Sequence, residues 1–301
     1  MGLRINNNIE AMVAHRNLLK NDRALSKSLE RLASGQRINR AADDPAALVI
    51  SEHMRAEISG MEQAIRNNEV AISLVQTAEG SMNEISSLLI SIRQRAISAA
   101  NVGASDAAMT QANQSEIENA LSSIDRIVSS TQFGQYKLLD GTNARKTLED
   151  GTIKEGLRFH VGPDAGHTAS VSIRNMTTSQ LGRLAEGELP NKSSFMSLAD
   201  IDVSTEQGSQ DTLAIIDQAI TEVATVRGEL GAFQANTLES NLTSLQVAAE
   251  NMTSAESTLR DTDMAQELAT FTRNQIMSQS ATAQLAQANA LPQNVLRLLN
   301  S

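Results

Sequence analysis

Apolar residues near the start of the chain recur with the spacing of one helical face. Between residues 3 and 34 most gaps are three, four or seven, and the positions are Ile5, Ile9, Met12, Leu19, Leu25, Leu29 and Leu32. This spacing predicts an amphipathic helix whose apolar stripe packs against another helix as in a coiled coil. Ser34-Gly35 should end the helix, because glycine accepts the left-handed conformation that closes helices.

A much longer periodic segment runs from Pro45 to about Asn101 without an internal proline. Asp44 is expected to cap it, and Pro45 suits its first position, where a missing N–H costs nothing. The expected buried positions are Ile58, Met61, Ile65, Ile72, Val75, Met82, Leu89 and Ala96. Polar residues interrupt this series at Asn68, Glu79, Ser86 and Arg93. A helix of this length spans roughly 80 Å, which predicts a rod.

The middle of the chain changes character after a shorter predicted helix at about 105–130. Residues 131–190 are rich in glycine, and two short alternating runs, 157–161 and 169–173, flank a turn at 162–166. Alternation with a period of two around such a turn predicts a β-hairpin. This is the only β-structure that the sequence predicts.

Helical periodicity returns near Asp211 and continues to about residue 258. A last helical segment follows from about 259 to 300, with a kink expected at Pro292. The predicted fold class is mainly α, with a long antiparallel helical rod or coiled coil from both chain ends and a small β-hairpin region in the middle. Neither end can bury its apolar stripe alone, so the ends should pair with each other and with neighbouring subunits.

Composition excludes several classes of function. The chain has no cysteine, which excludes disulfides, thiol nucleophiles and cysteine-based metal sites. Its net charge of −10 argues against nucleic-acid binding, which needs concentrated Lys and Arg. The chain contains no apolar run of about 18 residues, so no membrane-spanning helix is predicted. The first twelve residues lack the apolar core and small-residue site of a cleaved secretory signal.

Candidate catalytic or metal-binding groups are few. His160, Asp164 and His167 could meet across the hairpin turn and bind a metal ion, but a solvated turn is preferred because no second cluster supports a site. Asp43-Asp44 is better explained by capping than by acid–base chemistry. No phosphate-binding loop or nucleophile motif is present. We therefore expect no catalytic residue, no metal and no cofactor, and the chain should not be an enzyme.

Six longer blocks of sequence carry a family resemblance. They are INNNIEAM (5–12), LERLASGQRINRAADDPAAL (29–48), SIDRIVSSTQFGQYKLLDG (123–141), RGELGAFQ (227–234), ESTLRDTDMAQELA (256–269) and LAQANALPQNVLRLL (285–299). In these blocks, and over nearly its whole length, the chain resembles bacterial flagellin. It looks like a short form that lacks the large variable outer domain.

The resemblance implies a structural subunit that polymerises into the flagellar filament for swimming motility. It implies five segments: an N-terminal assembly helix and connector of the inner tube (1–44), rod helices with the β-hairpin (45–180), a short remnant of the variable region (181–210), a C-terminal rod helix (211–258) and a C-terminal assembly helix (259–301). Assembly is then assigned to terminal apolar residues, namely Ile5, Ile9, Met12, Leu29, Leu32, Leu268, Phe271, Leu285, Val295 and Leu298. These ends are expected to be disordered before assembly.

The resemblance also implies partners and a location. They are other copies of the chain, an export chaperone on residues 260–301, the flagellar export apparatus, and the cap and junction proteins. The expected location is the extracellular flagellum, reached without a cleaved signal peptide. The alternative is a flagellin-like protein of the hook–filament junction, which shares the terminal helical scheme.

Flagellins also carry a helical segment that animal Toll-like receptor 5 recognises, typically Arg-x-Arg-Glu-Leu-Ala. The aligned residues here are Ser91, Ile92, Arg93, Gln94, Arg95 and Ala96. Arg93 and Ala96 match, whereas Gln94 and Arg95 depart. Arg95 in place of leucine should disturb both the receptor contact and the neighbouring packing, so weak recognition is predicted.

Overall fold

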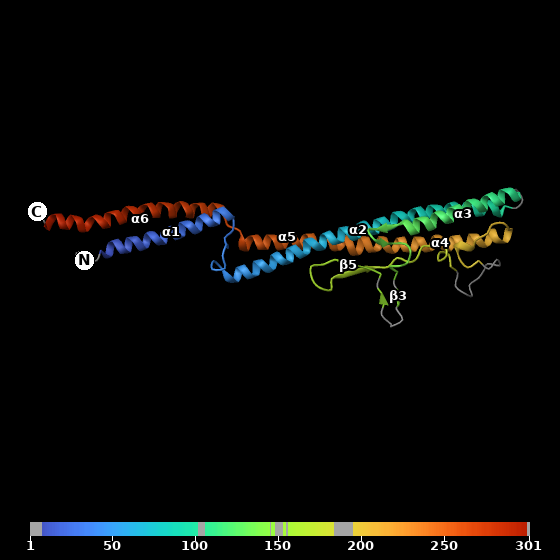
Figure 1. Ribbon diagram of the computed structural model, residues 1–301, viewed down its shortest axis with the longest axis horizontal. Coiled ribbons are helices and arrows are strands. Elements are labelled where there is room, and N and C mark those ends of the chain that lie inside the picture. The colour runs from blue at the N-terminus through green and yellow to red at the C-terminus, as the bar shows by residue number, and fades with distance from the viewer. Residues whose placement is uncertain are drawn as a thin grey trace. The chain divides into compact units, whose positions relative to one another are not determined.

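The computed structural model describes residues 8–101, 106–144, 146–147, 153–154, 156–183 and 195–299, with the backbone alone at 146–147, 153–154 and 291–299. Within these ranges the helices are α1 (Ile9–Ser34), α2 (Pro45–Ala100), α3 (Ala107–Ser130), α4 (Glu206–Ala232), α5 (Ser240–Arg260) and α6 (Met264–Leu299), with the 3-10 helix η1 (Leu198–Asp200) and the π-helix η2 (Phe233–Glu239). Long helices from both chain ends dominate (Figure 1), which confirms the predicted mainly-α class.

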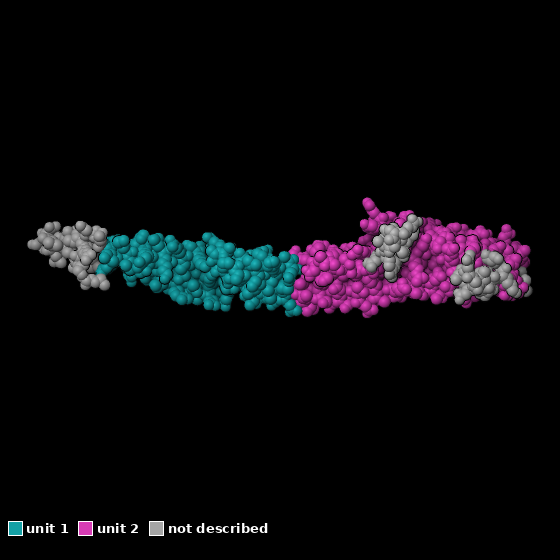
Figure 2. Space-filling view, turned by 90° about the horizontal axis from the view of Figure 1, so that it is seen from below, with its two compact units in different colours: residues 1–58, 250–301 teal, residues 59–249 magenta. Residues whose placement is uncertain are grey.

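The chain forms two compact units, which Figure 2 shows in different colours. Unit 1 comprises residues 1–58 and 250–301, and unit 2 comprises residues 59–249. The five segments expected from the sequence stay a prediction.

In unit 1, α1 and α6 lie side by side and antiparallel (Figure 1). Asn8 caps α1, since its side chain accepts a hydrogen bond from the backbone N–H of Ala11 at 3.1 Å. Gly35 ends the helix with φ of 71°, and its N–H donates to the Arg31 carbonyl at 2.9 Å. Asp44 caps α2 by accepting from the N–H of Ala47 at 3.0 Å. The predicted end of α1 and the predicted cap of α2 are both confirmed.

In unit 1 the backbone segments 35–37 and 260–262 lie side by side and are joined by hydrogen bonds. We call this pair of segments the clasp. The Arg37 N–H donates to the Arg260 carbonyl at 2.7 Å, and the Thr262 N–H donates to the Gly35 carbonyl at 2.9 Å. The two segments form an antiparallel bridge between Gln36 and Asp261. Beside the clasp, Ile38 is almost fully buried. This polar-looking connector is therefore a packed part of the fold.

The α2 helix of unit 2 buries two rows of side chains, each repeating every seven residues. One row is Met61, Asn68, Val75, Met82, Leu89 and Ala96. The other is Ala64, Ala71, Ala78, Ile85, Ile92 and Ala99. The first row was predicted. It includes Asn68, where a polar interruption was expected. The second row was predicted one residue too late, at Ile65 and Ile72. The interruptions expected at Glu79, Ser86 and Arg93 were wrong, because the buried positions there are Ala78, Ile85 and Ile92.

Helices α3 and α4 contribute buried side chains to the same core of unit 2. The predicted face of α3 is confirmed, because Ile117, Leu121, Ile124 and Val128 are all buried. Helix α4 runs antiparallel to α2, as two ion pairs show: Arg93 with Asp217 at 2.7 Å and Arg227 with Glu79 at 3.7 Å.

The π-helix η2 lies between α4 and α5 and changes the spacing of the buried side chains. In α4 they repeat every seven residues at Ser209, Ile216, Val223 and Leu230. The next is Leu238, eight residues on, and the spacing of seven resumes at Leu245. The wider turn of the π-helix accommodates one extra residue, so that Leu238 still faces the core.

Among its described residues, unit 2 also contains three short antiparallel strand pairs. The predicted hairpin is confirmed as β5 (Leu157–His160) with β6 (Thr168–Val171). The expectation of no other β-structure was wrong, because β1 (Gln132–Phe133) pairs with β2 (Tyr136–Lys137), and β3 (Lys146–Thr147) pairs with β4 (Ile153–Lys154). Strands of two residues are too short to show an alternating pattern.

Three asparagine amides fix the β5–β6 hairpin to the helices. The Val161 carbonyl accepts from the side chains of Asn68, on α2, at 3.3 Å and Asn241, on α5, at 2.5 Å. The neighbouring His160 carbonyl accepts from Asn67 at 3.0 Å. Gly60 lies against Pro163 of the hairpin turn, where an added Cβ would come within 3.2 Å of the proline ring. The hairpin is thus held at its turn end.

Candidate functional site

The contact between α1 and α6 is made mostly of small and polar side chains. The side chains of α6 that are buried or nearest the contact repeat every seven residues as Glu267, Asn274, Ala281 and Ala288. Facing them on α1 is Ser28, which is buried, with Ala14 and Asn21 partly buried on the same row. Large apolar side chains of these helices, such as Leu25, Leu32, Phe271 and Leu285, are only partly buried, so they contribute less hydrophobic stabilisation than the fully buried side chains of unit 2.

Polar contacts join the two helices along this line. The Asn21 amide donates to the Met277 carbonyl at 3.2 Å, and the Ser278 hydroxyl donates to the Asp22 carboxylate at 2.7 Å. Further toward the end of the pair, the Asn8 amide donates to the Ala288 carbonyl at 2.8 Å. Such bonds specify which residues face each other more than they add stability.

Arg31 and Glu267 form an incompletely satisfied ion pair between the same helices. Their nearest charged atoms are 3.5 Å apart, while Arg31 Nε and Glu267 Oε1 are buried without a hydrogen-bond partner. Buried charges without full hydrogen bonding cost free energy. This end of the contact is therefore weaker than an ion pair with ideal geometry.

Large apolar side chains of the same two helices point to solvent instead. We call them the outer apolar set: Ile9, Met12, Val13, Leu19, Leu29, Met264, Leu268, Ile276 and Met277. Along α1 and α6 the normal distribution is thus inverted: the buried side chains are Ser28, Glu267, Ala281 and Ala288, whereas many leucine, isoleucine and methionine side chains are exposed. Exposed apolar side chains of this size are available for contact with another protein.

The assembly residues predicted from the sequence fall into three groups. Ile9, Met12, Leu29 and Leu268 are exposed members of the outer apolar set, so they do not form the contact between α1 and α6. Leu32, Phe271 and Leu285 are partly buried. Ile5 lies outside the described residues, and so do the side chains of Val295 and Leu298, although both belong to α6. Their role in assembly stays a prediction.

Arginine side chains hold the clasp together. Arg37 donates to the Leu259 carbonyl at 2.5 Å, and Arg260 donates to the Gln36 side chain at 3.3 Å and to the Glu52 carboxylate at 2.7 Å. The Arg260 hydrogen bond holds the pKa of Glu52 below its usual value. Sequence reasoning missed these residues, since a charged side chain in a polar connector gives no periodic signal.

Asp43 is a second charged anchor of the connector. Its carboxylate lies 2.6 Å from the Lys27 ammonium group and accepts hydrogen bonds from the backbone N–H groups of Arg40 and Asn39. The Lys27 hydrogen bond, together with those two backbone bonds, lowers the pKa of Asp43. The carboxylate therefore acts as a structural acceptor, in line with the preference for a non-catalytic role.

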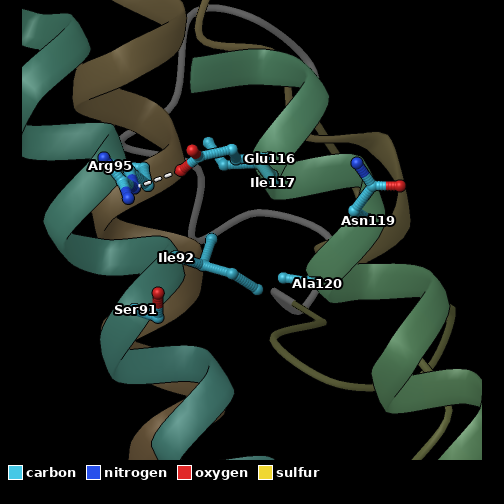
Figure 3. Close-up of a pocket in the computed structure, with 7 residues that line it drawn as sticks. All are labelled: Ser91, Ile92, Arg95, Glu116, Ile117, Asn119 and Ala120. Carbon is cyan, nitrogen blue, oxygen red and sulfur yellow. Dashed lines mark ion pairs between the residues drawn. The ribbon is translucent and has the colours of Figure 1, made fainter. Parts of the chain in front are cut away.

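The segment aligned with the receptor motif borders a shallow cavity of about 280 Å³ between α2 and α3 (Figure 3). Arg95 is half exposed there and pairs with Glu116 of α3, so the expectation that it disturbs packing was wrong. Arg93 pairs with Asp217, which raises the pKa of the guanidinium. Ala96 is fully buried in the α2 core and Gln94 is exposed.

The hairpin turn with His160, Asp164 and His167 is exposed, and the His167 N–H donates to the Asp164 carbonyl at 3.3 Å. Within the part of the chain that the structure describes, no cluster of three histidine, aspartate or glutamate side chains could hold a metal ion. Over the same residues, no helix combines the length and apolar character that crossing a membrane requires.

Two family models match the chain. The bacterial flagellin N-terminal helical region matches residues 5–144, and the bacterial flagellin C-terminal helical region matches residues 213–299. Flagellin from Bacillus subtilis is 42% identical over 99% of this chain and 100% of that protein. The flagellar filament 30.7 kDa core protein of Treponema maltophilum is 38% identical over 98% of this chain and 99% of that protein.

Among solved structures, a putative flagellar hook-associated protein from Vibrio parahaemolyticus is similar to this chain with a TM-score of 0.55. The match covers 73% of this chain and 100% of that chain at 16% sequence identity. At this identity the likeness concerns the fold alone.

Proposed function

The chain belongs to the bacterial flagellin family, and from this premise we propose that it is the structural subunit that polymerises into a flagellar filament. It is not an enzyme, since the family is structural. One observation supports the proposal most directly: the side chains that the terminal helices bury are small or polar, whereas the outer apolar set is exposed. We propose that this set is covered by other copies of the chain.

The energetics agree with this role. Fully burying an exposed apolar side chain contributes about 1.5–3 kcal/mol. The members of the outer apolar set are 39–68% exposed, so covering four of them contributes on the order of 3–6 kcal/mol before the costs of association. A filament also needs contacts between different surfaces of successive subunits, because contacts that repeat without closing generate an open helix. The α1 and α6 helices together offer such surfaces on more than one side.

Polymerisation of single variants tests the proposal. Leu268→Asp places a charge in the outer apolar set, and we expect the concentration of subunit needed for filament growth to rise at least about tenfold. Gln284→Asp is the matched control, since it adds the same charge to an exposed polar position of the same helix. Electron microscopy of seeded filaments gives the readout. Equal growth of both variants would remove the assembly role from this surface.

The junction-protein alternative gains no support from the relatives, which are named flagellin and flagellar filament core protein. The likeness to a hook-associated protein is one of fold. Growth behaviour separates the two functions. A filament subunit extends seeds into long filaments at high concentration, whereas a junction protein stops after a short ring.

We propose that the family's layered arrangement applies here, with residues 1–44 and 259–301 forming the inner tube. Residues 45–180 and 211–258 would form the next layer, with 181–210 as the short variable remnant. The partly buried and exposed apolar residues of α1 and α6 support the inner placement, because a tube wall surrounds each helix pair with neighbours. A density map of the assembled filament tests each boundary.

As a filament component the chain is exported outside the cell. We propose that a chaperone captures residues 260–301 beforehand, in the mode in which an apolar helix face lies in a groove. Leu268 and Ile276 are exposed in this segment and would supply the face. The flagellar export apparatus and the cap and junction proteins are the further partners. Export should leave the N-terminus uncleaved, which the mass of the secreted chain measures.

Recognition by Toll-like receptor 5 is proposed to be weak. Two arginines of the aligned segment are already engaged, Arg93 with Asp217 and Arg95 with Glu116, so a receptor must compete with these ion pairs. Arg95→Leu, which restores the family residue, should increase activation in a receptor reporter assay. An activity of the unchanged chain equal to that of enteric flagellins would contradict the proposal.

A further inference from the structure

The described methionines include fully buried, partly buried and exposed side chains. Met61, Met82 and Met176 are buried in unit 2. Met12, Met264 and Met277 are 68%, 49% and 50% exposed, and all three belong to the outer apolar set of α1 and α6. Two further exposed methionines, Met109 and Met196, lie in unit 2. The proposed assembly surface therefore holds three of the five exposed methionines among the described residues.

We propose that Met12, Met264 and Met277 are sites of reversible oxidation by peroxides, and that their oxidation blocks polymerisation. This inference rests on the proposed function. In the reaction the thioether sulfur takes one oxygen atom from hydrogen peroxide, the O–O bond breaks, and water leaves. The sulfur is oxidised to the sulfoxide and the peroxide is reduced. A methionine sulfoxide reductase with a thiol donor reverses the change.

The effect on assembly follows from the change in polarity. Methionine is flexible and apolar, so it adapts to the surface of a neighbouring subunit. The sulfoxide carries a strong hydrogen-bond acceptor, which loses its water when the surface is covered. Ile9, Val13, Leu268 and Ile276 share the outer apolar set and supply no side-chain donor to replace that water.

The fold of unit 2 should survive the same treatment. Met82 and Met176 are at most 1% exposed, and oxidants reach exposed methionines first. The oxidised subunit thus keeps its packed core while its terminal surface becomes polar. Because the chain has no cysteine, peroxide has no thiol to oxidise, and the response can be assigned to methionine.

The test compares polymerisation of purified subunit before and after treatment with hydrogen peroxide. We expect the critical concentration to rise about tenfold or more, equivalent to at least about 1.4 kcal/mol per subunit. Treatment with methionine sulfoxide reductase should restore growth. Mass spectrometry of peptides should locate the added oxygen at Met12, Met264 and Met277 in free subunits and find these residues protected in filaments oxidised after assembly.

Two variants distinguish the proposed sites from other damage. Met12→Leu/Met264→Leu/Met277→Leu keeps the apolar volume and should polymerise after peroxide treatment as before it. Met109→Leu/Met196→Leu is the matched control and should remain sensitive. Unchanged growth of the oxidised chain, or equal sensitivity of both variants, would overturn the inference. A chain that forms no filaments before any treatment would instead refute the proposed function.

Discussion

Removing one residue from the π-helix η2 should be tolerated, whereas removing one from α4 should not. Ala235 lies exposed within η2, and Ala224 lies exposed within α4. Each residue of an α-helix adds about 100° of rotation, so a deletion turns the following side chains away from the core. Deletion of Ala235 removes the extra residue of η2. Leu238 then lies seven residues after Leu230 and faces the core in a continuous α-helix.

Deletion of Ala224 has a cost that the structure sets. If η2 becomes an ordinary α-helix, the side chains after it face the core again. Val226 and Leu230 lie between the deletion and η2, so they stay rotated away from the core. Both are 1% exposed. Losing their burial costs about 1.5–3 kcal/mol each, so this deletion should lower the free energy of unfolding by about 3–6 kcal/mol. Deletion of Ala235 shifts α5 by about 1.5 Å and strains the Asn241–Val161 hydrogen bond, a cost of about 1 kcal/mol.

Urea unfolding followed by far-ultraviolet circular dichroism measures both changes. The two variants each lose one exposed alanine, so the difference between them isolates the phase of the helix. If deletion of Ala235 destabilises unit 2 as much as deletion of Ala224, the π-helix does not accommodate an extra residue and the reasoning fails.

Three further outcomes are expected. Arg260→Ala should make the clasp susceptible to protease. Arg55→Ala, which removes the other arginine near Glu52, should leave it resistant. Equal cleavage of the two variants would show that Arg260 does not hold the clasp together. The pKa of Asp43 is lowered in the folded chain, so the ionised carboxylate stabilises the fold above the ordinary value of 3.8, and this stabilisation is lost as the pH falls through the folded value. Asp43→Asn should therefore destabilise the connector at neutral pH but not in strong acid. Unfolding measured across pH will show the difference. Truncation of residues 261–301 should abolish polymerisation while unit 2 keeps its helical signal, and loss of all helicity would contradict this.

Helices were predictable from the sequence because their apolar spacing is local. The C-terminal end of α1 and the cap of α2 followed from Gly35 and Asp44, whose chemistry is explicit in the sequence. The second buried row of α2 was predicted one residue away from its true position, because Ile65 and Ile72 are larger and more hydrophobic than Ala64 and Ala71, which are the buried residues. Burial follows the geometry of the helix and its partners, and side-chain size alone does not fix it.

The candidate site was only half predictable. The outer apolar residues were found, and they were expected to contact both the opposite terminal helix and neighbouring subunits. The observed contact uses Asn21 and Ser28 of α1 and Asn274 of α6. Each belongs to a row that repeats every seven residues along its own helix, but these rows carry no hydrophobic signal. The clasp depends on residues more than 200 positions apart, which a local pattern cannot connect.

The pairing of α1 with α6 joins residues that are as many as 280 positions apart, which gives this contact a very high contact order. Closing a flexible loop of that length costs about 5 kcal/mol, and the few polar contacts of this helix pair repay it poorly. Folding of unit 2 lowers this cost, because Asn68 and Asn241 meet at the Val161 carbonyl. Ser28 then lies 40 residues before Asn68, and Asn274 lies 33 residues after Asn241. Most of the residues in these two intervals are helical. The two ends of the chain are therefore the last parts to find each other, and α1 stays unpaired throughout synthesis until α6 has been made.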